Sequence, residues 1–148
     1  MNRREVLTAA SALSLAGIAT RALAVDPTPA GHEHHASESR YADLVSATSN
    51  CIAAGDACLS HCLVLLGQGD KELATCARTV RDTIAACTAL REVAAADSPH
   101  VKALAKVVSG ICSDCEAECK KHEQHPVCKD CEKACHDCKE ICDKVAAA

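Results

Sequence analysis

Residues 112–142 read CSDCEAECKKHEQHPVCKDCEKACHDCKEIC, and this stretch decides the fold. Its eight cysteines recur at steps of three and four residues, with one longer gap between Cys119 and Cys128. That recurrence is the period of one face of an α-helix. At 100° per residue, the five cysteines from Cys128 to Cys142 fall within an arc of roughly 80°. The pattern predicts helices that carry thiols where a helix bundle normally carries leucine.

Outward from this stretch, the sequence predicts four helices, at about residues 39–66, 71–95, 99–122 and 126–145. Gly67 and Gly69 end the first helix, and Asp70 caps the second. Pro99 and Pro126 stand at the first positions of the third and fourth helices. All three connections are short, and no alternating β-branched run predicts a strand. We therefore expect an all-α protein, an antiparallel up-down-up-down four-helix bundle with a cysteine-lined core.

Antiparallel pairing also predicts the level of each cysteine along the bundle. One end should hold Cys62, Cys76, Cys119 and Cys128, while Cys51, Cys87 and Cys142 should lie roughly 24 Å deeper at 1.5 Å per residue. Beyond the deeper group, an apolar plug is expected from Leu44, Leu90, Val101, Leu104 and Val145. The predicted core is a tube of thiols, open at one end and sealed at the other.

The first 38 residues predict export and a flexible tail. Arg3-Arg4 precedes a short apolar run, and Ala22-Leu23-Ala24 forms a cleavage site. The arginine pair favours a twin-arginine signal over residues 1–24 rather than an ordinary secretory signal. We then expect a histidine-rich tail over residues 25–38, with His32, His34 and His35, followed by the bundle over residues 39–146. The periplasm or another membrane-enclosed bacterial compartment is the expected location.

Three uses of thirteen thiols compete. Disulfides are the usual choice of an exported chain, but residues four apart on a helix have Cβ atoms about 5–6 Å apart, whereas a disulfide needs about 3.5–4.5 Å. Cys112-x2-Cys115 and Cys128-x2-Cys131 imitate a four-cysteine zinc site, yet the same period continues past both pairs and lies within helices. Cu(I) prefers soft thiolates, and a column of thiols can hold a column of such ions.

The candidate ligands for Cu(I), several ions per chain, are the thirteen cysteines and one histidine: Cys51, Cys58, His61, Cys62, Cys76, Cys87, Cys112, Cys115, Cys119, Cys128, Cys131, Cys135, Cys138 and Cys142. A metallothionein-like buffer for zinc or heavy metals remains the alternative function. A disulfide-stapled structural protein is a third interpretation. No nucleophile–histidine–acid spacing predicts an enzyme, no basic patch predicts a nucleic-acid partner, and no second apolar run predicts a membrane span.

The chain resembles the bacterial copper storage proteins, four-helix bundles whose inward cysteines bind many Cu(I) ions. The residues that carry the resemblance are Cys58-Leu59-Ser60-His61-Cys62, Cys76, Cys87, the spacing Cys112-x2-Cys115-x3-Cys119 and the five-cysteine run of the last helix. The resemblance implies a homotetramer that stores copper for exported or membrane copper enzymes. It also implies methionine and histidine ligands near the open end in exported members, where this sequence has His61 but Leu65, Gln68 and Leu73.

The remaining histidines have two interpretations each. His122 and His125 are expected in the last turn, as polar turn residues or as extra ligands at the open end. His61 lies at the edge of its helix stripe, and only the family motif favours it as a ligand. His32, His34 and His35 could capture metal or stay solvated. His100 and His136 should face outward without a role.

Overall fold

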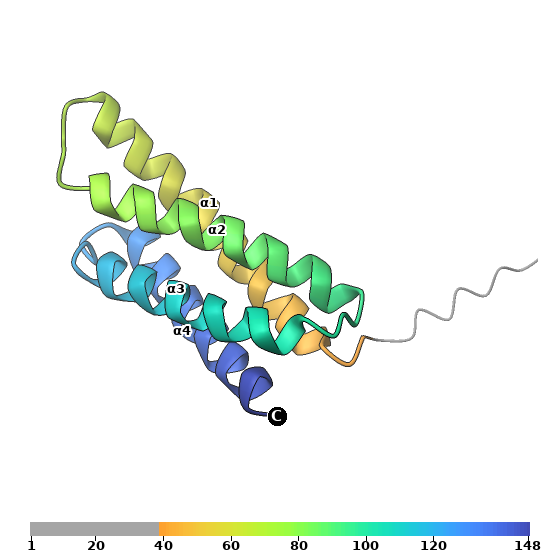
Figure 1. Ribbon diagram of the computed structural model, residues 1–148. Helices are drawn as coiled ribbons and strands as arrows, with labels where there is room; N and C mark the ends of the chain where they lie inside the picture. The colour runs from red at the N-terminus through yellow and green to blue at the C-terminus, as the bar shows by residue number, and fades with distance from the viewer. Residues whose placement is uncertain (1–38) are drawn as a thin grey trace, which may run out of the picture. The chain divides into compact units, whose positions relative to one another are not determined.

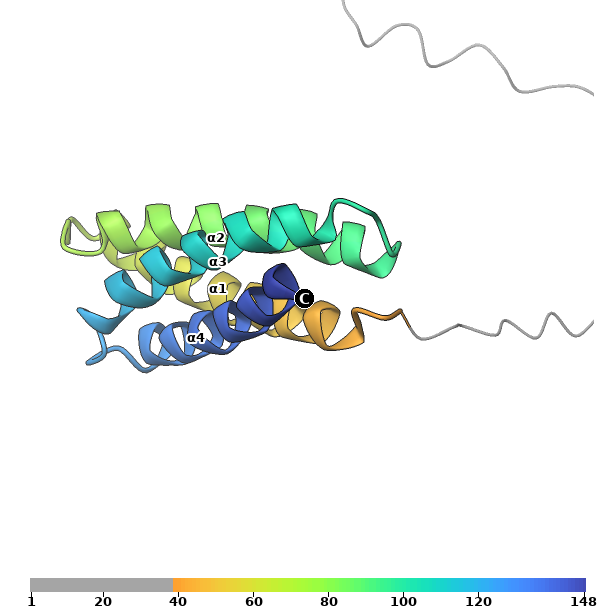
Figure 2. The ribbon, with the colours of Figure 1, turned by 60° about the horizontal axis from the view of Figure 1, so that its bottom comes forward.

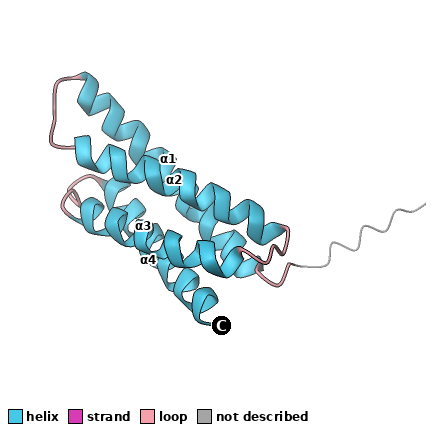
Figure 3. Cartoon of the chain, viewed as in Figure 1, coloured by secondary structure: helices cyan, strands magenta, loops and turns pink. Residues whose placement is uncertain are grey.

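The computed structural model describes residues 39–148, which form four α-helices. These are α1 (Ala42–Gly67), α2 (Ala74–Ala95), α3 (Val101–Lys120) and α4 (Pro126–Ala147). Each helix packs against its neighbours in chain order, and α4 packs back on α1, so that the four surround one axis (Figure 1 and Figure 2). No strand occurs within residues 39–148 (Figure 3). The predicted antiparallel four-helix bundle is confirmed.

Several helix boundaries differ from the prediction, and local hydrogen bonds explain the differences. α1 begins at Ala42 rather than residue 39, because the Ser39 hydroxyl donates to the Ala94 carbonyl (2.9 Å) and fastens the chain to the α2–α3 turn. α2 begins at Ala74 rather than residue 71, because Asp70 accepts from the Glu72 N–H (2.9 Å) and closes a turn before the helix.

The α2–α3 turn also differs from the prediction, which placed Pro99 at the first position of the third helix. Asp97 adopts a positive φ of 49°, the left-handed conformation that ends many helices. The Ser98 N–H then donates back to the Val93 carbonyl (3.0 Å), so Ser98 and Pro99 complete a turn. Helix α3 therefore starts at Val101, two residues later than expected.

The core consists of sulfur and aliphatic side chains. All thirteen cysteines are buried, each with at most 1% of its surface exposed. The largest other buried residues are Leu44, Leu73, Leu90, Val80, Val101 and Val108. Leu44, Leu90 and Val101 form the plug, at the end that holds the α2–α3 turn, with Leu104 and Val145 partly buried against the core. We call the opposite end, where the α1–α2 and α3–α4 turns lie, the mouth (Figure 1).

Two threonines on the inward stripes satisfy their hydroxyls within their own helices. Thr48 donates to the Leu44 carbonyl (2.7 Å), and Thr83 donates to the Thr79 carbonyl (3.0 Å). Because such a bond satisfies a buried hydroxyl locally, neither threonine adds an unpaired polar group to the core.

The plug and the buried thiols should hold the fold without metal. We expect the metal-free, reduced protein to give a helical circular dichroism spectrum close to that of the loaded form, because four amphipathic helices bury an apolar core unaided. Leu90→Ala should lower the free energy of unfolding by about 2–5 kcal/mol in a urea titration. Val107→Ala, at a position 57% exposed on α3, is the control with little effect. A random-coil spectrum of the metal-free protein would contradict this account.

Candidate metal centre

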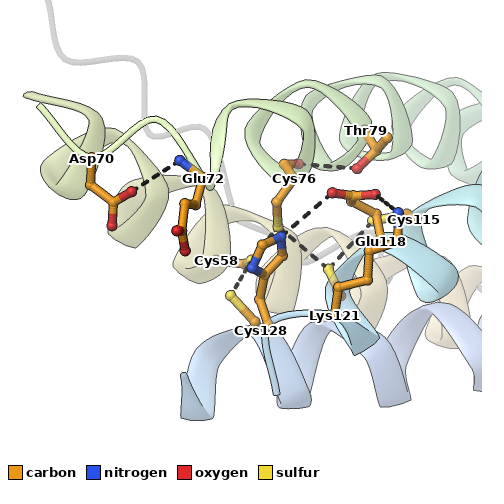
Figure 4. A network of polar contacts seen from close by, with 11 residues as sticks. Cys58, Asp70, Glu72, Cys76, Thr79, Cys115, Glu118, Lys121 and Cys128 are labelled. Atoms are coloured by element: carbon orange, nitrogen blue, oxygen red, sulfur yellow. Dashed lines mark hydrogen bonds and ion pairs between the residues drawn. The ribbon is translucent and has the colours of Figure 1, made fainter. Parts of the chain in front are cut away.

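The thiols converge from different helices in four layers along the bundle axis. The mouth layer contains Cys58, Cys62, Cys76 and Cys128, whose sulfur atoms all lie within 4.8 Å of one another. Cys58 contributes the shortest contacts, at 3.6 Å to the Cys128 sulfur and 3.8 Å to the Cys76 sulfur. Figure 4 shows these three side chains directed toward one another from α1, α2 and α4. A soft ion placed here would meet ligands from three helices at once.

The other layers continue the column toward the plug. Two layers of three thiols follow the mouth layer, and a deep layer of four ends the series. Their members are Cys58, Cys119 and Cys131; Cys115, Cys131 and Cys135; and, in the deep layer, Cys51, Cys87, Cys112 and Cys138. Cys62 and Cys51 are eleven positions apart on α1, about 16 Å along the axis, so the column is shorter than the roughly 24 Å expected. Cys142 belongs to none of the four layers.

Sulfur contacts link every layer to the next. Cys58 and Cys131 are each members of two layers, and the Cys51 and Cys135 sulfurs lie 3.8 Å apart across the last step. Such separations suit a bridging ion, since two bonds of about 2.3 Å reach across a gap of up to about 4.6 Å. They are also far longer than a disulfide bond of about 2.05 Å, and all thirteen cysteines are free in this structure.

The layers separate the four cysteines that imitated a zinc site in the sequence. Cys112 lies in the deep layer and Cys128 in the mouth layer, while Cys115 and Cys131 share the layer between with Cys135. The two CxxC pairs therefore do not meet at one ion. A helical period, rather than a zinc knuckle, accounts for their spacing.

Two levels predicted from antiparallel pairing are shifted by about one helical turn. Cys119 contacts Cys76 (3.8 Å) but belongs to the layer below the mouth layer. Cys142 was expected beside Cys51 and Cys87, but Cys138 occupies that level. The helix termini explain the error, because each turn has its own length and sets its own register between neighbouring helices.

The thiols of the mouth layer differ in pKa because burial and neighbouring groups act on them differently. Burial, followed by the charge of nearby Cys58, raises the pKa of both Cys62 and Cys128 above the ordinary thiol range. Hydrogen bonds from Cys119, Cys131 and Cys76 lower the pKa of Cys58 instead. Within this layer, proton loss is therefore easier at Cys58 than at Cys62 or Cys128.

A buried carboxylate, Glu118, lies near the mouth layer in the last turn of α3. Glu118 is only 8% exposed, and its carboxylate pairs with Lys121 (Figure 4). The hydrogen bond from Lys121 lowers the pKa of Glu118, so this carboxylate stays ionised. His122 Nε2 lies 3.5 Å from Glu118 Oε1 and has no hydrogen-bond partner within residues 39–148. His122 lies in the α3–α4 turn but is only 9% exposed, so it is a buried turn residue.

His61 and His125 meet at the mouth, which the sequence alone did not indicate. His61 Nε2 lies 3.0 Å from His125 Nδ1, joining the end of α1 to the residue before α4. His136, expected to have no role, instead contacts Glu116 across the α3–α4 interface (3.0 Å), as Lys139 does. Burial acts to raise the pKa of Glu116, but the hydrogen bonds from Lys139 and His136 outweigh it and lower that pKa.

Comparison with known proteins agrees with this geometry. A family described as copper storage protein matches residues 37–147. The chain is 33% identical over 103 residues to an uncharacterized cysteine-rich protein, YhjQ, of Bacillus subtilis, an alignment that covers 70% of this chain and 93% of the relative. The chain belongs to the copper storage protein family.

Solved structures of relatives share the fold. Apo copper storage protein 3 from Bacillus subtilis superposes with a TM-score of 0.64 at 30% identity, covering 72% of this chain and 98% of the relative. The copper storage protein Ccsp from Streptomyces lividans, loaded with 10 copper equivalents, gives a TM-score of 0.66 at 26% identity, covering 83% and 93%. Both relatives align along nearly their whole length, so the bundle as a unit is shared.

The raised pKa values of Cys62 and Cys128 predict a definite pH dependence of metal binding. Both thiols are protonated at neutral pH, so an ion that binds them must displace their protons. Apparent Cu(I) affinity should therefore rise with pH, by about tenfold per unit for each proton displaced, and fall on acidification. Competition with a chelator of known protonation constants between about pH 6 and about pH 8 measures the slope. An affinity independent of pH would show that the thiols bind already ionised.

Proposed function

We propose that this chain stores Cu(I), binding many ions per chain through its core thiolates. The observation that carries the proposal is the charge of the core. Thirteen thiols are buried together, and no lysine or arginine is among the buried side chains of residues 39–148. Thiolates without a counter-ion would be very costly in such surroundings. One Cu(I) per thiolate leaves the core neutral, whereas a zinc ion held by four thiolates leaves two negative charges.

The same charge argument ranks the alternative, a zinc or heavy-metal buffer, below copper storage. Either four-thiol layer could surround a tetrahedral ion, because zinc–sulfur bonds of about 2.3 Å give sulfur separations of about 3.8 Å. Filling the column with such sites would nevertheless accumulate buried negative charge at every step. Family membership and the Cu(I)-bound copper storage protein BsCsp3, which matches with a TM-score of 0.65 at 29% identity, support copper.

The role proposed is a reservoir without catalytic activity. The thiols are buried in a column, whereas cysteine-based catalysis needs an exposed thiol of low pKa. The stored copper would supply an exported or membrane copper enzyme, and the chains would assemble as a homotetramer, as the family resemblance implies. The twin-arginine signal of residues 1–24 and the histidine-rich tail of residues 25–38 lie outside the described residues. Export to the periplasm by that route remains part of the proposal.

Copper would enter at the mouth. The mouth layer is closest to the α1–α2 and α3–α4 turns, while the opposite end is filled by the plug. The sequence predicted an open mouth, but Cys62 and Cys128 are fully buried and Leu73, next to α2, is only 1% exposed. Side chains must therefore move before an ion can reach a thiol. His61, His122 and His125 are the proposed first ligands.

Stoichiometry is the decisive test of storage. Anaerobic Cu(I) titration of the reduced chain, against a competing chelator, should saturate near one ion per cysteine, because that ratio neutralises the thiolates. Zn²⁺ should stop at about three ions, one for each four thiols. Saturation by one to three Cu(I) ions would contradict storage and favour a carrier with one discrete site.

The end at which Cu(I) enters can be tested by comparing uptake rates among variants that bind the same number of ions. Leu73→Ala should speed Cu(I) uptake because it opens the mouth, whereas Leu90→Ala in the plug should leave the rate unchanged. His125→Ala should slow uptake, with His136→Ala as the control because His136 lies away from the mouth on α4. Stopped-flow measurement with a coloured Cu(I) chelate supplies the rates. Faster loading by Leu90→Ala and unchanged loading by Leu73→Ala would reverse the assigned polarity.

A further inference from the structure

The outer face of α1 carries few charged residues for a helix that faces solvent. Between Ala42 and Gly67 there is no lysine or arginine, and the only carboxylates are Asp43 and Asp56. Leu63 and Val64 are 57% and 56% exposed. By length and composition α1 could cross a membrane. Only 22% of its most apolar window is buried in the bundle, so most of that window is exposed. A bundle helix normally covers its outer face with charges. The exposed face of α1 is therefore suited to burial against another surface.

Grooves of opposite character flank α1. The groove between α1 and α2, about 290 Å³, has Leu59 and Leu63 beside Arg78 and Arg81, and no acidic residue lines it. The groove between α1 and α4, about 540 Å³, is lined by four carboxylates against two lysines: Asp43, Asp130, Asp137, Glu140, Lys133 and Lys144. One side of α1 is thus basic and the other mainly acidic.

The basic side and the acidic side carry exposed charges at the same level along the bundle axis. Cys58 contacts both Cys76 and Cys128, which sets these residues of α2 and α4 at one level along the axis. Both helices run opposite to α1, so Arg78 and Asp130, each two residues further on, also share a level. Both are exposed, and neither forms an ion pair within residues 39–148.

We propose that the outer face of α1 binds a second copy of the chain about a two-fold axis parallel to the helix. This rotation places α2 of one copy over α4 of the other, so that Arg78 faces Asp130 of the second copy, and the pair occurs twice. A two-fold axis perpendicular to α1 would instead oppose arginine with arginine. The mouths of both copies then lie at the same end. The proposal rests on the proposed homo-oligomer and is independent of copper storage.

The size of the face is adequate for a stable pair. Helix α1 is about 39 Å long, and with its flanking grooves it presents a strip about 20 Å wide, close to the 800 Å² per partner of a standard interface. A lipid bilayer fits less well, because Arg78, Arg81 and Asp130 beside α1 would enter the hydrocarbon. Self-association buries the apolar strip and pairs these charges.

Charge reversal tests the arrangement in the reduced chain from residue 25 onward. Analytical ultracentrifugation should show dimers or larger even-numbered assemblies. Arg78→Glu and Asp130→Arg should each weaken association by about tenfold or more, and the double variant should restore it. Leu63→Asp should also weaken association, whereas Val107→Asp, at a position 57% exposed on α3, should not.

A monomeric wild-type chain would overturn the proposal, and so would a double variant that associates no better than its single parents. Loss of phosphatidylcholine vesicle binding in Leu63→Asp, with unchanged self-association, would likewise overturn it and assign the face to lipid. Cu(I) capacity is measured on the same variants. If monomeric variants still bind nearly one Cu(I) per cysteine, the storage proposal stands even where the interface proposal is wrong. The two proposals can therefore be tested independently.

Discussion

The burial of thirteen sulfur atoms in one apolar column is the constraint on which the molecule depends. Such a core must remain close to neutral, because charged groups without partners are very costly away from water. Protons neutralise most of the thiols in the empty protein, and a monovalent soft cation can replace them one for one. The bundle supplies no internal cation, so the occupant has to bring the charge.

A scaffold for this column must also be stable when empty. Sulfur and aliphatic groups pack well enough to close the bundle, and the threonine hydroxyls bond within their own helices. Leu44, Leu90 and Val101 fill the end that holds no layer of thiols. One segment of the four helices therefore carries the thiol layers, and another segment, at the plug, contributes apolar packing without binding metal. A protein organised in this way can change its load without folding or unfolding.

Much of this architecture could be predicted from the sequence, because helical period is local information. The steps between Cys128 and Cys142 predicted a single inward face, and short turns predicted antiparallel helices. The composition of each layer could not be predicted, since it depends on how far one helix is shifted along its neighbour. That is why Cys138, rather than Cys142, joins Cys51 and Cys87. The meeting of His61 with His125 and the burial of Glu118 depend on the same shifts.

Two sulfur atoms each belong to two adjacent layers. Cys58 belongs to the first and second layers, and Cys131 to the second and third. An ion bound to either sulfur can exchange its remaining ligands for those of the next layer without leaving that atom. Among the first three layers, movement of an ion along the axis would thus be a series of ligand exchanges on a shared sulfur. The step from the third layer to the deep layer would differ, because no sulfur belongs to both and an ion would cross from Cys135 to Cys51, 3.8 Å away.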